Sequence, residues 1–290
     1  MHPALTPGAH SIVVDGIVQR YHVHGAGPVC VVHPGGPGVS WNVMRLPGLE
    51  DANTLVYVEP IGTGESGRLP DSEWYTLGRY AAHLRAIVEA VGGHGVALLG
   101  HAHGGSVLQE YITAYPGSVR ALVLVCSTPV GDDELIRETA DNLARFAERH
   151  HDRGEAGDVE AAYLDMLTAA DDHTLTHAVR RLFPAYVRDY WDNTSYAGYF
   201  KLRSAVTAWA GPSGRGGFSR TDFRDRLAGV RTPTLVIAGA WDPIVSARWS
   251  RSLEVCLPGS RLVQFAASAH LPHLEEPEVF RSTVNDFLLR

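Results

Sequence analysis

Three positions, in the chain order Ala102, Asp242 and His270, stand in sequence contexts typical of nucleophilic acyl transfer. Ala102 is the centre of Gly100-His101-Ala102-His103-Gly104-Gly105, which lies between an apolar run and a helical pattern. This G-x-S-x-G-like pattern predicts a tight, strained turn that presents a nucleophile at a helix N-terminus. Alanine occupies the place of the serine. A methyl group cannot attack a carbonyl, so we expect the chain to bind substrate and barely turn it over.

The candidate acid and base lie further along the chain. Asp242 follows an apolar run in Gly239-Ala240-Trp241-Asp242-Pro243, and His270 lies in the loop 268–277 after the last apolar run. An acid so placed accepts the Nδ1–H of a histidine and fixes the tautomer that takes a serine proton. Alone, an aspartate before proline is more often a turn residue, and a lone histidine is more often a surface residue.

Two backbone N–H groups are the candidate oxyanion hole. His33-Pro34-Gly35-Gly36-Pro37-Gly38 directly follows a predicted strand, and proline cannot donate. Gly36 or Gly35 must therefore supply the first N–H, and we favour Gly36. The second comes from His103, the residue after the nucleophile position.

Short apolar runs alternate with helical patterns on either side of a helical stretch. Such alternation indicates parallel βαβ units. A two-residue hairpin at Asp15-Gly16 joins the first two runs. We therefore predict an α/β fold with a mostly parallel, eight-stranded sheet flanked by helices, a core of residues 1–129 and 219–290, and a helical cap at 130–218. The predicted strands are 11–14, 17–23, 29–32, 54–58, 96–99, 121–125, 234–238 and 261–265, and the clearest core helices are 77–91 and 106–115.

Composition and net charge exclude some classes of binding partner. The chain has 290 residues and a net charge of −7, which argues against nucleic acid and an anionic membrane as partners. Without a signal peptide or membrane span, and with three widely spaced cysteines, we expect a cytoplasmic protein with buried thiols. His22 with His24, or His101 with His103, lacks a third converging ligand. We predict no metal and no cofactor, and the oligomeric state stays open.

The whole chain resembles the α/β-hydrolase superfamily, in which nucleophile, acid and histidine follow in this order and a cap lies between the sixth and seventh strands. Gly35–Gly38 and Glu59-Pro60-Ile61-Gly62-Thr63-Gly64-Glu65-Ser66 resemble the proline iminopeptidase group. That resemblance implies an alternative, an aminopeptidase in which acidic cap residues bind a free amino terminus. Glu59 stands where that group usually has aspartate.

Alanine at position 102 has three interpretations. We favour an engineered serine replacement, because every other motif is intact. A natural non-catalytic relative would be a small-molecule binding protein. A native aspartate, as in epoxide hydrolases and dehalogenases, fits less well, because those enzymes commonly carry an aromatic residue where this chain has His103.

The substrate prediction follows from the aromatic residues of the cap. They favour an ester, lactone, thioester or amide of a mid-sized hydrophobic molecule, although most of them are expected to form the cap's own core. The cap aromatics are Tyr163, Phe183, Tyr186, Tyr190, Trp191, Tyr196, Tyr199, Phe200 and Trp209. The predicted substrate-binding residues are Gly35, Tyr186, Tyr190, Trp191 and Trp241.

Overall fold

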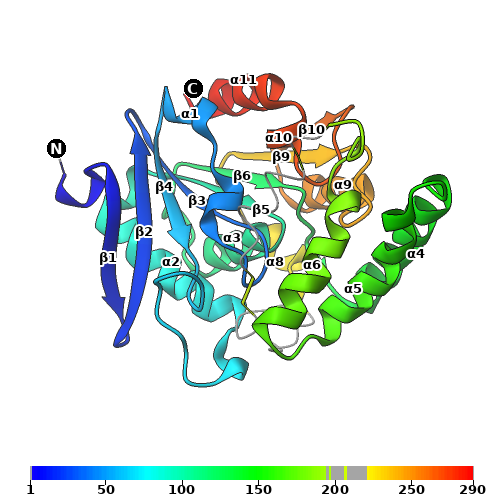
Figure 1. The fold of residues 1–290 in the computed structure, drawn as a ribbon. Helices are drawn as coiled ribbons and strands as arrows, with labels where there is room; N and C mark the ends of the chain where they lie inside the picture. The colour runs from blue at the N-terminus through cyan, green and yellow to red at the C-terminus, as the bar shows by residue number, and fades with distance from the viewer. Residues whose placement is uncertain (1, 194–195, 197–205, 208–220, 290) are drawn as a thin grey trace.

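A mostly parallel sheet of eight strands runs through the molecule in the order β1-β2-β4-β3-β5-β6-β9-β10 (Figure 1). The computed structural model describes residues 2–193, 196, 206–207 and 221–289. Within this sheet, only the pairings of β2, with β1 and with β4, are antiparallel. The strands are β1 Gly8–Val14, β2 Ile17–Gly25, β3 Val29–His33, β4 Thr54–Glu59, β5 Ala97–His101, β6 Ala121–Val125, β9 Thr234–Gly239 and β10 Arg261–Phe265.

The predicted hairpin is confirmed. Asp15 and Gly16 have φ values of 50° and 79°, the left-handed pair that a two-residue turn needs to match the twist of its strands. The central strands β4, β5, β6 and β9 are buried along their whole length. Burial on both faces explains why they appear in the sequence as continuous apolar runs.

Helices cover both faces of the sheet (Figure 1). Residues of α2 and α3 belong to the hydrophobic cluster on one face, and residues of α1 and α11 to the cluster on the other. Helix α2 begins where the Thr76 hydroxyl accepts the N–H of Arg79 and ends at Gly92, whose φ is 132°. The core helices are α1 Pro47–Glu50, α2 Leu77–Val91, α3 His103–Ala114, α8 Arg224–Leu227, α9 Ala247–Cys256, α10 Pro272–Glu275 and α11 Pro277–Leu288.

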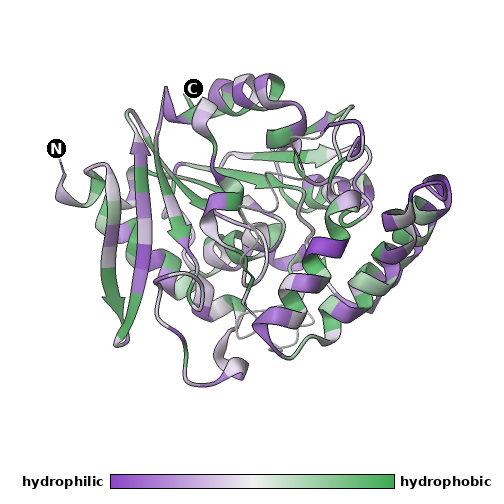
Figure 2. Ribbon diagram, in the orientation of Figure 1, coloured by the Kyte–Doolittle hydropathy of each residue, from purple (hydrophilic) through white to green (hydrophobic). Residues whose placement is uncertain are grey.

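Among the described residues, the cap contains α4 Asp133–Arg149, α5 Val159–Thr168 and α6 Asp172–Tyr186, inserted between β6 and β9, the sixth and seventh strands of the sheet. Two short strands, β7 Val130–Gly131 and β8 Thr221–Asp222, pair where the chain leaves and re-enters the core. The cap has its own hydrophobic cluster, which includes Tyr163 and Phe183. Figure 2 shows the polar outer surface of α4 and the apolar central strands. The predicted α/β fold with a helical cap is confirmed.

Some predictions differ from the structure or fall outside it. Helix α3 begins at His103, not at residue 106, because the turn at Ala102 leads directly into the helix. Cys30 and Cys126 are buried, but Cys256 is partly exposed. Tyr199, Phe200, Trp209 and the predicted link 211–217 lie outside the described residues, so the cap boundaries at 130 and 218 stay predictions.

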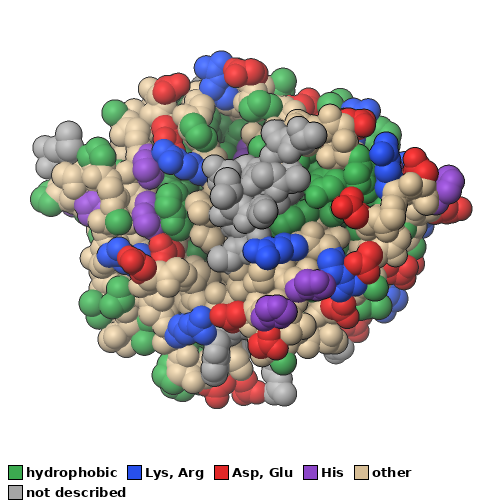
Figure 3. Space-filling model, in the orientation of Figure 1, with side chains coloured by type: hydrophobic (Ala, Val, Ile, Leu, Met, Phe, Trp, Pro, Cys, Tyr) green, Lys and Arg blue, Asp and Glu red, His purple; other side chains and the backbone are tan. Residues whose placement is uncertain are grey.

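Hydrophobic and charged side chains gather at different places on the surface of the cap (Figure 3). In Figure 3, hydrophobic side chains gather towards the upper end of α6, while charged side chains and histidines lie over the lower cap helices. Within the described ranges, no helix has the length and apolarity that crossing a bilayer requires.

Candidate active site

Ala102 alone forms the turn between β5 and α3. Its backbone has φ 47° and ψ −116°, which for a residue other than glycine costs roughly 1–3 kcal/mol. The turn is possible because its neighbours are small. A Cβ on Gly104 would lie 2.4 Å from the carbonyl oxygens of His33 and Pro34, and one on Gly100 would lie 2.7 Å from that of Gly104. The structure thus keeps a strained turn that the alanine side chain does not need.

Asp242 and His270 meet at the C-terminal edge of the sheet. The Nδ1 atom of His270 lies 2.8 Å from Oδ2 of Asp242, and both side chains are buried. The other carboxylate oxygen accepts the N–H groups of Ile244 and Val245, at 2.8 and 3.0 Å. Because those bonds occupy Oδ1, Oδ2 is left for the imidazole N–H, the geometry that an acid orienting a base requires.

The candidate oxyanion donors lie beside Ala102. Gly36 has φ +126°, a conformation that side chains rarely adopt, and a Cβ there would lie 2.9 Å from the N atom of Gly38. His103 is the first residue of α3, so its N–H has no partner within the helix. In the described chain, neither N–H donates to another backbone group. Both residues line the same cavity as Ala102 and His270.

Neutral imidazoles surround the site. Nε2 of His101 donates to the backbone carbonyl of His270 at 2.8 Å, because a carbonyl can only accept. Burial and the nearby His270 hold the pKa of His101 well below its usual range. Burial likewise lowers the pKa of His103 to about 3 and that of His33 to about 4. At neutral pH these rings are uncharged.

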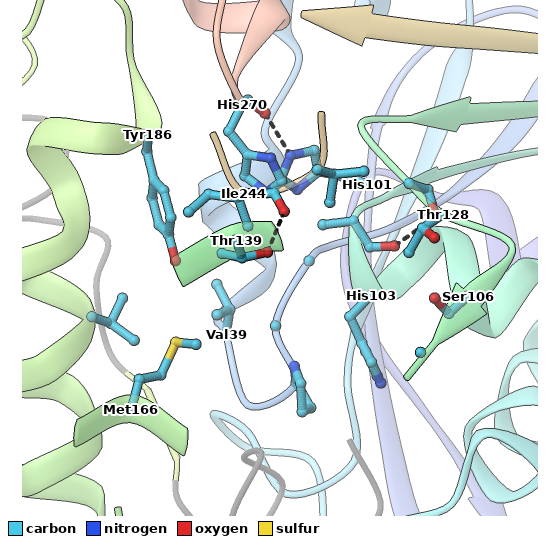
Figure 4. Close-up of a pocket in the computed structure, with 18 of the residues that line it drawn as sticks. Val39, His101, His103, Ser106, Thr128, Thr139, Met166, Tyr186, Ile244 and His270 are labelled. Atoms are coloured by element: carbon cyan, nitrogen blue, oxygen red, sulfur yellow. Dashed lines mark hydrogen bonds between the residues drawn. The ribbon is translucent and has the colours of Figure 1, made fainter. Parts of the chain in front are cut away.

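A cavity of about 150 Å³ lies between the core and the cap. In Figure 4, His270, His101 and His103 come from the core, and Met166 and Tyr186 face them from the cap helices. Among the described residues, none of those that line the cavity is Asp, Glu, Lys or Arg. Apart from the hydroxyl-bearing residues Thr139, Tyr163, Tyr186 and Thr221, the side chains that the cap and its flanks contribute are apolar. They include Leu135, Met166, Leu175, Val179, Phe183 and Val206.

The predicted substrate-binding residues divide into two groups. Gly35 and Tyr186 line the cavity, whereas Tyr190, Trp191 and Trp241 do not. Trp191 lies beside Phe146 on the cap and donates through Nε1 to Glu155 at 2.7 Å. Trp241 is 45% exposed, and its Nε1 donates to the carbonyl of Ala266 at 3.0 Å. Trp191 and Trp241 thus make these contacts outside the cavity, and Tyr190 packs against Trp191.

Glu275 is a residue of the site region that the sequence analysis missed. Its carboxylate accepts the N–H of Arg188, from the segment after α6, at 2.6 Å and the N–H of Ala269 at 2.8 Å. The N–H of His270 donates to the carbonyl of Tyr186 at 3.0 Å. Burial raises the pKa of Glu275 to about 7. These bonds join the loop of His270 to the end of the cap, a pairing of distant segments that no local motif signals.

Cys126 lies close to the Asp242–His270 pair, and the potential ligand atoms of the three are within 4.8 Å of one another. This set fits a metal poorly. Asp242 already binds three N–H groups, and burial raises the pKa of the Cys126 thiol well above its usual range, whereas metal ligation needs a thiolate.

Most of the chain matches one known protein family. The model of the family described as alpha/beta hydrolase fold matches residues 28–277. The chain is 26% identical to a proline iminopeptidase of Heyndrickxia coagulans, covering 93% of each chain. It is 28% identical to a 2-hydroxy-6-oxo-2,4-heptadienoate hydrolase of Pseudomonas putida, covering 96% of this chain and 95% of the relative. The crystal structure of an esterase from a Rhodococcus species superposes with a TM-score of 0.75 at 20% identity, over 96% of this chain and 97% of that one. At this identity the superposition supports the fold alone.

Proposed function

We propose that in this chain, which belongs to the alpha/beta hydrolase fold family, the cavity is a serine-hydrolase active site that lacks only the nucleophile. The chain with Ala102 binds a neutral, largely apolar acyl compound, and a form with serine at this position hydrolyses it. The observation that carries this proposal is the strained turn at Ala102, beside an Asp242–His270 pair at 2.8 Å. A methyl side chain at position 102 has no use for the strained turn or for an oriented histidine, whereas a nucleophile requires both.

In the serine form, each group has a defined role. His270 takes the hydroxyl proton at Nε2 as the oxygen attacks the acyl carbon, and Asp242 holds the imidazole at Nδ1. The N–H groups of Gly36 and His103 bind the oxyanion. The leaving group departs with a proton from His270, and water then hydrolyses the acyl-enzyme with His270 again as base.

The substrate class follows from the cavity lining. The core wall supplies imidazoles and N–H groups, while the cap wall supplies apolar side chains. A protonated amine buried there would need a carboxylate partner, since an unpaired buried charge costs several kcal/mol. The described lining offers none, so we propose an amine-free ester, lactone, thioester or amide. This choice separates the chain from the proline iminopeptidase that it resembles.

The test is turnover of p-nitrophenyl butyrate by the Ala102→Ser variant. Loss of a triad nucleophile costs about 10⁴–10⁶ in kcat, so the variant should gain a comparable factor over the Ala102 chain. The control is the double variant Ala102→Ser/His270→Ala, which should fall back to the starting rate. If the folded Ala102→Ser variant is no faster than the Ala102 chain, the hydrolase proposal fails and a binding protein becomes the better account.

A further inference from the structure

His270 is oriented to act as a base in the Ala102 chain. The Asp242 carboxylate accepts two backbone N–H groups on Oδ1, so Oδ2 accepts the Nδ1–H of His270 at 2.8 Å. This tautomer leaves a lone pair on Nε2. His270 lines the cavity, and no hydrogen bond joins its Nε2 to another group in the described chain.

Among the described residues, the only hydrogen bond of the His270 ring is the one from Nδ1 to Asp242, so no hydroxyl donates to Nε2. At position 102 a serine would do so, but a methyl group cannot. Three of the hydroxyls that line the cavity, those of Ser127, Thr128 and Thr139, donate to backbone carbonyls at 3.0, 3.0 and 2.9 Å. A ligand in the cavity therefore meets an oriented imidazole lone pair directly.

The same cavity has groups that stabilise a developing oxyanion. The N–H groups of Gly36 and His103 have no backbone acceptor in the described residues. His103 is the first residue of α3, a helix of 12 residues whose dipole favours negative charge at its N-terminal end, and Gly36 lines the same cavity. Stabilisation of an enolate needs the same donors as that of a tetrahedral intermediate, because both place charge on a former carbonyl oxygen.

We infer that the Ala102 chain itself catalyses proton abstraction from the carbon next to a carbonyl group, with His270 as the base and no covalent intermediate. The substrate class is a neutral ketone or thioester with an acidic α C–H. Nε2 of His270 takes the proton, the C–H electron pair forms the C=C bond, and the carbonyl π pair moves onto the oxygen. Return of the proton from the imidazolium to carbon regenerates the base, so no co-reactant is consumed.

This activity goes beyond the proposed hydrolysis and can be separated from it. Proton abstraction is measured in the Ala102 chain, whereas hydrolysis requires the Ala102→Ser variant. A chain that exchanges α-protons but whose Ala102→Ser variant is inactive would support this inference and contradict the proposed function. If the Ala102 chain does not exchange α-protons but its Ala102→Ser variant hydrolyses the ester, the proposed function is supported and this inference is contradicted.

The experiment follows hydrogen–deuterium exchange by proton NMR in D₂O. The probes are phenylacetone and the thioester of phenylacetic acid with N-acetylcysteamine, which are uncharged and carry activated α-protons. General-base catalysis typically contributes 10²–10⁴-fold, so we expect exchange at least about 10²-fold faster than in buffer with an equal concentration of free imidazole.

Two variants and one control assign the base. His270→Asn should lose the acceleration, and Asp242→Asn should lose most of it, because the asparagine no longer holds the same tautomer. His273→Gln is the matched control, since His273 is buried nearby but does not line the cavity, and it should retain the exchange rate. Circular dichroism checks that each variant is folded. Exchange of both probes at the buffer rate, or equal acceleration by the His270→Asn protein, would overturn the inference.

Discussion

The two walls of the cavity, one from the core and one from the cap, differ in the groups that line them. The core wall carries strand ends, glycine turns, backbone N–H groups and some apolar side chains such as Leu77 and Leu271, and burial keeps its His101 and His103 neutral. The cap wall consists mainly of apolar side chains that project from α4, α5 and α6 (Figure 4). The first wall fixes positions to which chemistry is sensitive. The second provides shape and apolar contact, so its substitutions should change selectivity before they change chemistry.

The walls are nevertheless joined at the two loops that carry the candidate acid and base. The hydroxyl of Thr139 on α4 donates to the carbonyl of Ile244 at 2.9 Å. The guanidinium groups of Arg149 and Arg188 lie 5.6 and 4.9 Å from the ring centre of Trp241, beside Asp242. Movement of the cap would therefore act on the loop of the acid.

The largest expected effect lies on the core wall. In the Ala102→Ser background, His270→Ala should reduce kcat by about 10⁴-fold or more, since it removes the base. His273→Ala should retain most of the activity, because this ring does not line the cavity. Steady-state kinetics with p-nitrophenyl butyrate give the ranking, and the opposite order of the two variants would refute the assignment.

The second effect is acid sensitivity of the buried imidazoles in and around the core wall. Burial lowers the pKa of His33 and His273 to about 4 and of His103 to about 3, and it also lowers that of His101. The unfolded chain takes up these protons near pH 6.5 and the folded chain does not. Stability is thus present above pH 6.5 and lost as the pH falls. Glu275 has the opposite effect on stability. Burial raises its pKa to about 7, so its protonated form contributes stability at low pH, and that contribution is lost as the pH rises through 7.

The four imidazoles together change the free energy of unfolding more than the single carboxyl group of Glu275 does. We expect the free energy of unfolding to fall by several kcal/mol between pH 7 and pH 5, on the basis of 1.36 kcal/mol per proton and pH unit. Urea titrations at both pH values measure it. The Glu275→Gln variant removes the opposing contribution and should lose more stability over this interval than the parent. Equal stability at pH 7 and pH 5 in the parent chain would contradict the assignment of these rings as buried and neutral.

The third prediction concerns the cap wall. In the Ala102→Ser background, Met166→Ala removes an apolar side chain that lines the cavity, so KM for the butyrate ester should rise roughly three- to tenfold with little change in kcat. Leu164→Ala on the same helix is the matched control, because Leu164 is 52% exposed. A fall in kcat without a change in KM would show that the division between the walls is wrong.

The smallest effect is discrimination against a free amine. The Ala102→Ser variant should prefer acyl anilides or esters over matched aminoacyl ones near neutral pH, since the described lining carries no acid. The comparison is of kcat/KM. A preference of about tenfold or more for the free amine, about 1.4 kcal/mol in transition-state binding, would indicate an acid that pairs with it.

The two walls also differ in how far the sequence predicts them. Strands β6 and β10 were predicted to the residue, and the turn at Ala102 was identified from its glycines, because local constraints determine both. The lining of the cap depends on which side of a helix meets the core. Consequently Tyr186 lines the cavity but Trp191 packs outside it, and nothing in their sequence spacing distinguishes them. Glu275 was missed for the same reason, since its partners Ala269 and Arg188 come from two elements.

The most direct test of the central claim is covalent labelling at position 102. The Ala102→Ser variant is incubated with a fluorophosphonate, and its intact mass and peptide map are measured. The account predicts a single adduct on the peptide that carries position 102, absent from the Ala102 chain and strongly slowed by the additional His270→Ala substitution. A folded Ala102→Ser protein that takes up no label, or that is labelled elsewhere as readily as the Ala102 chain, would contradict it.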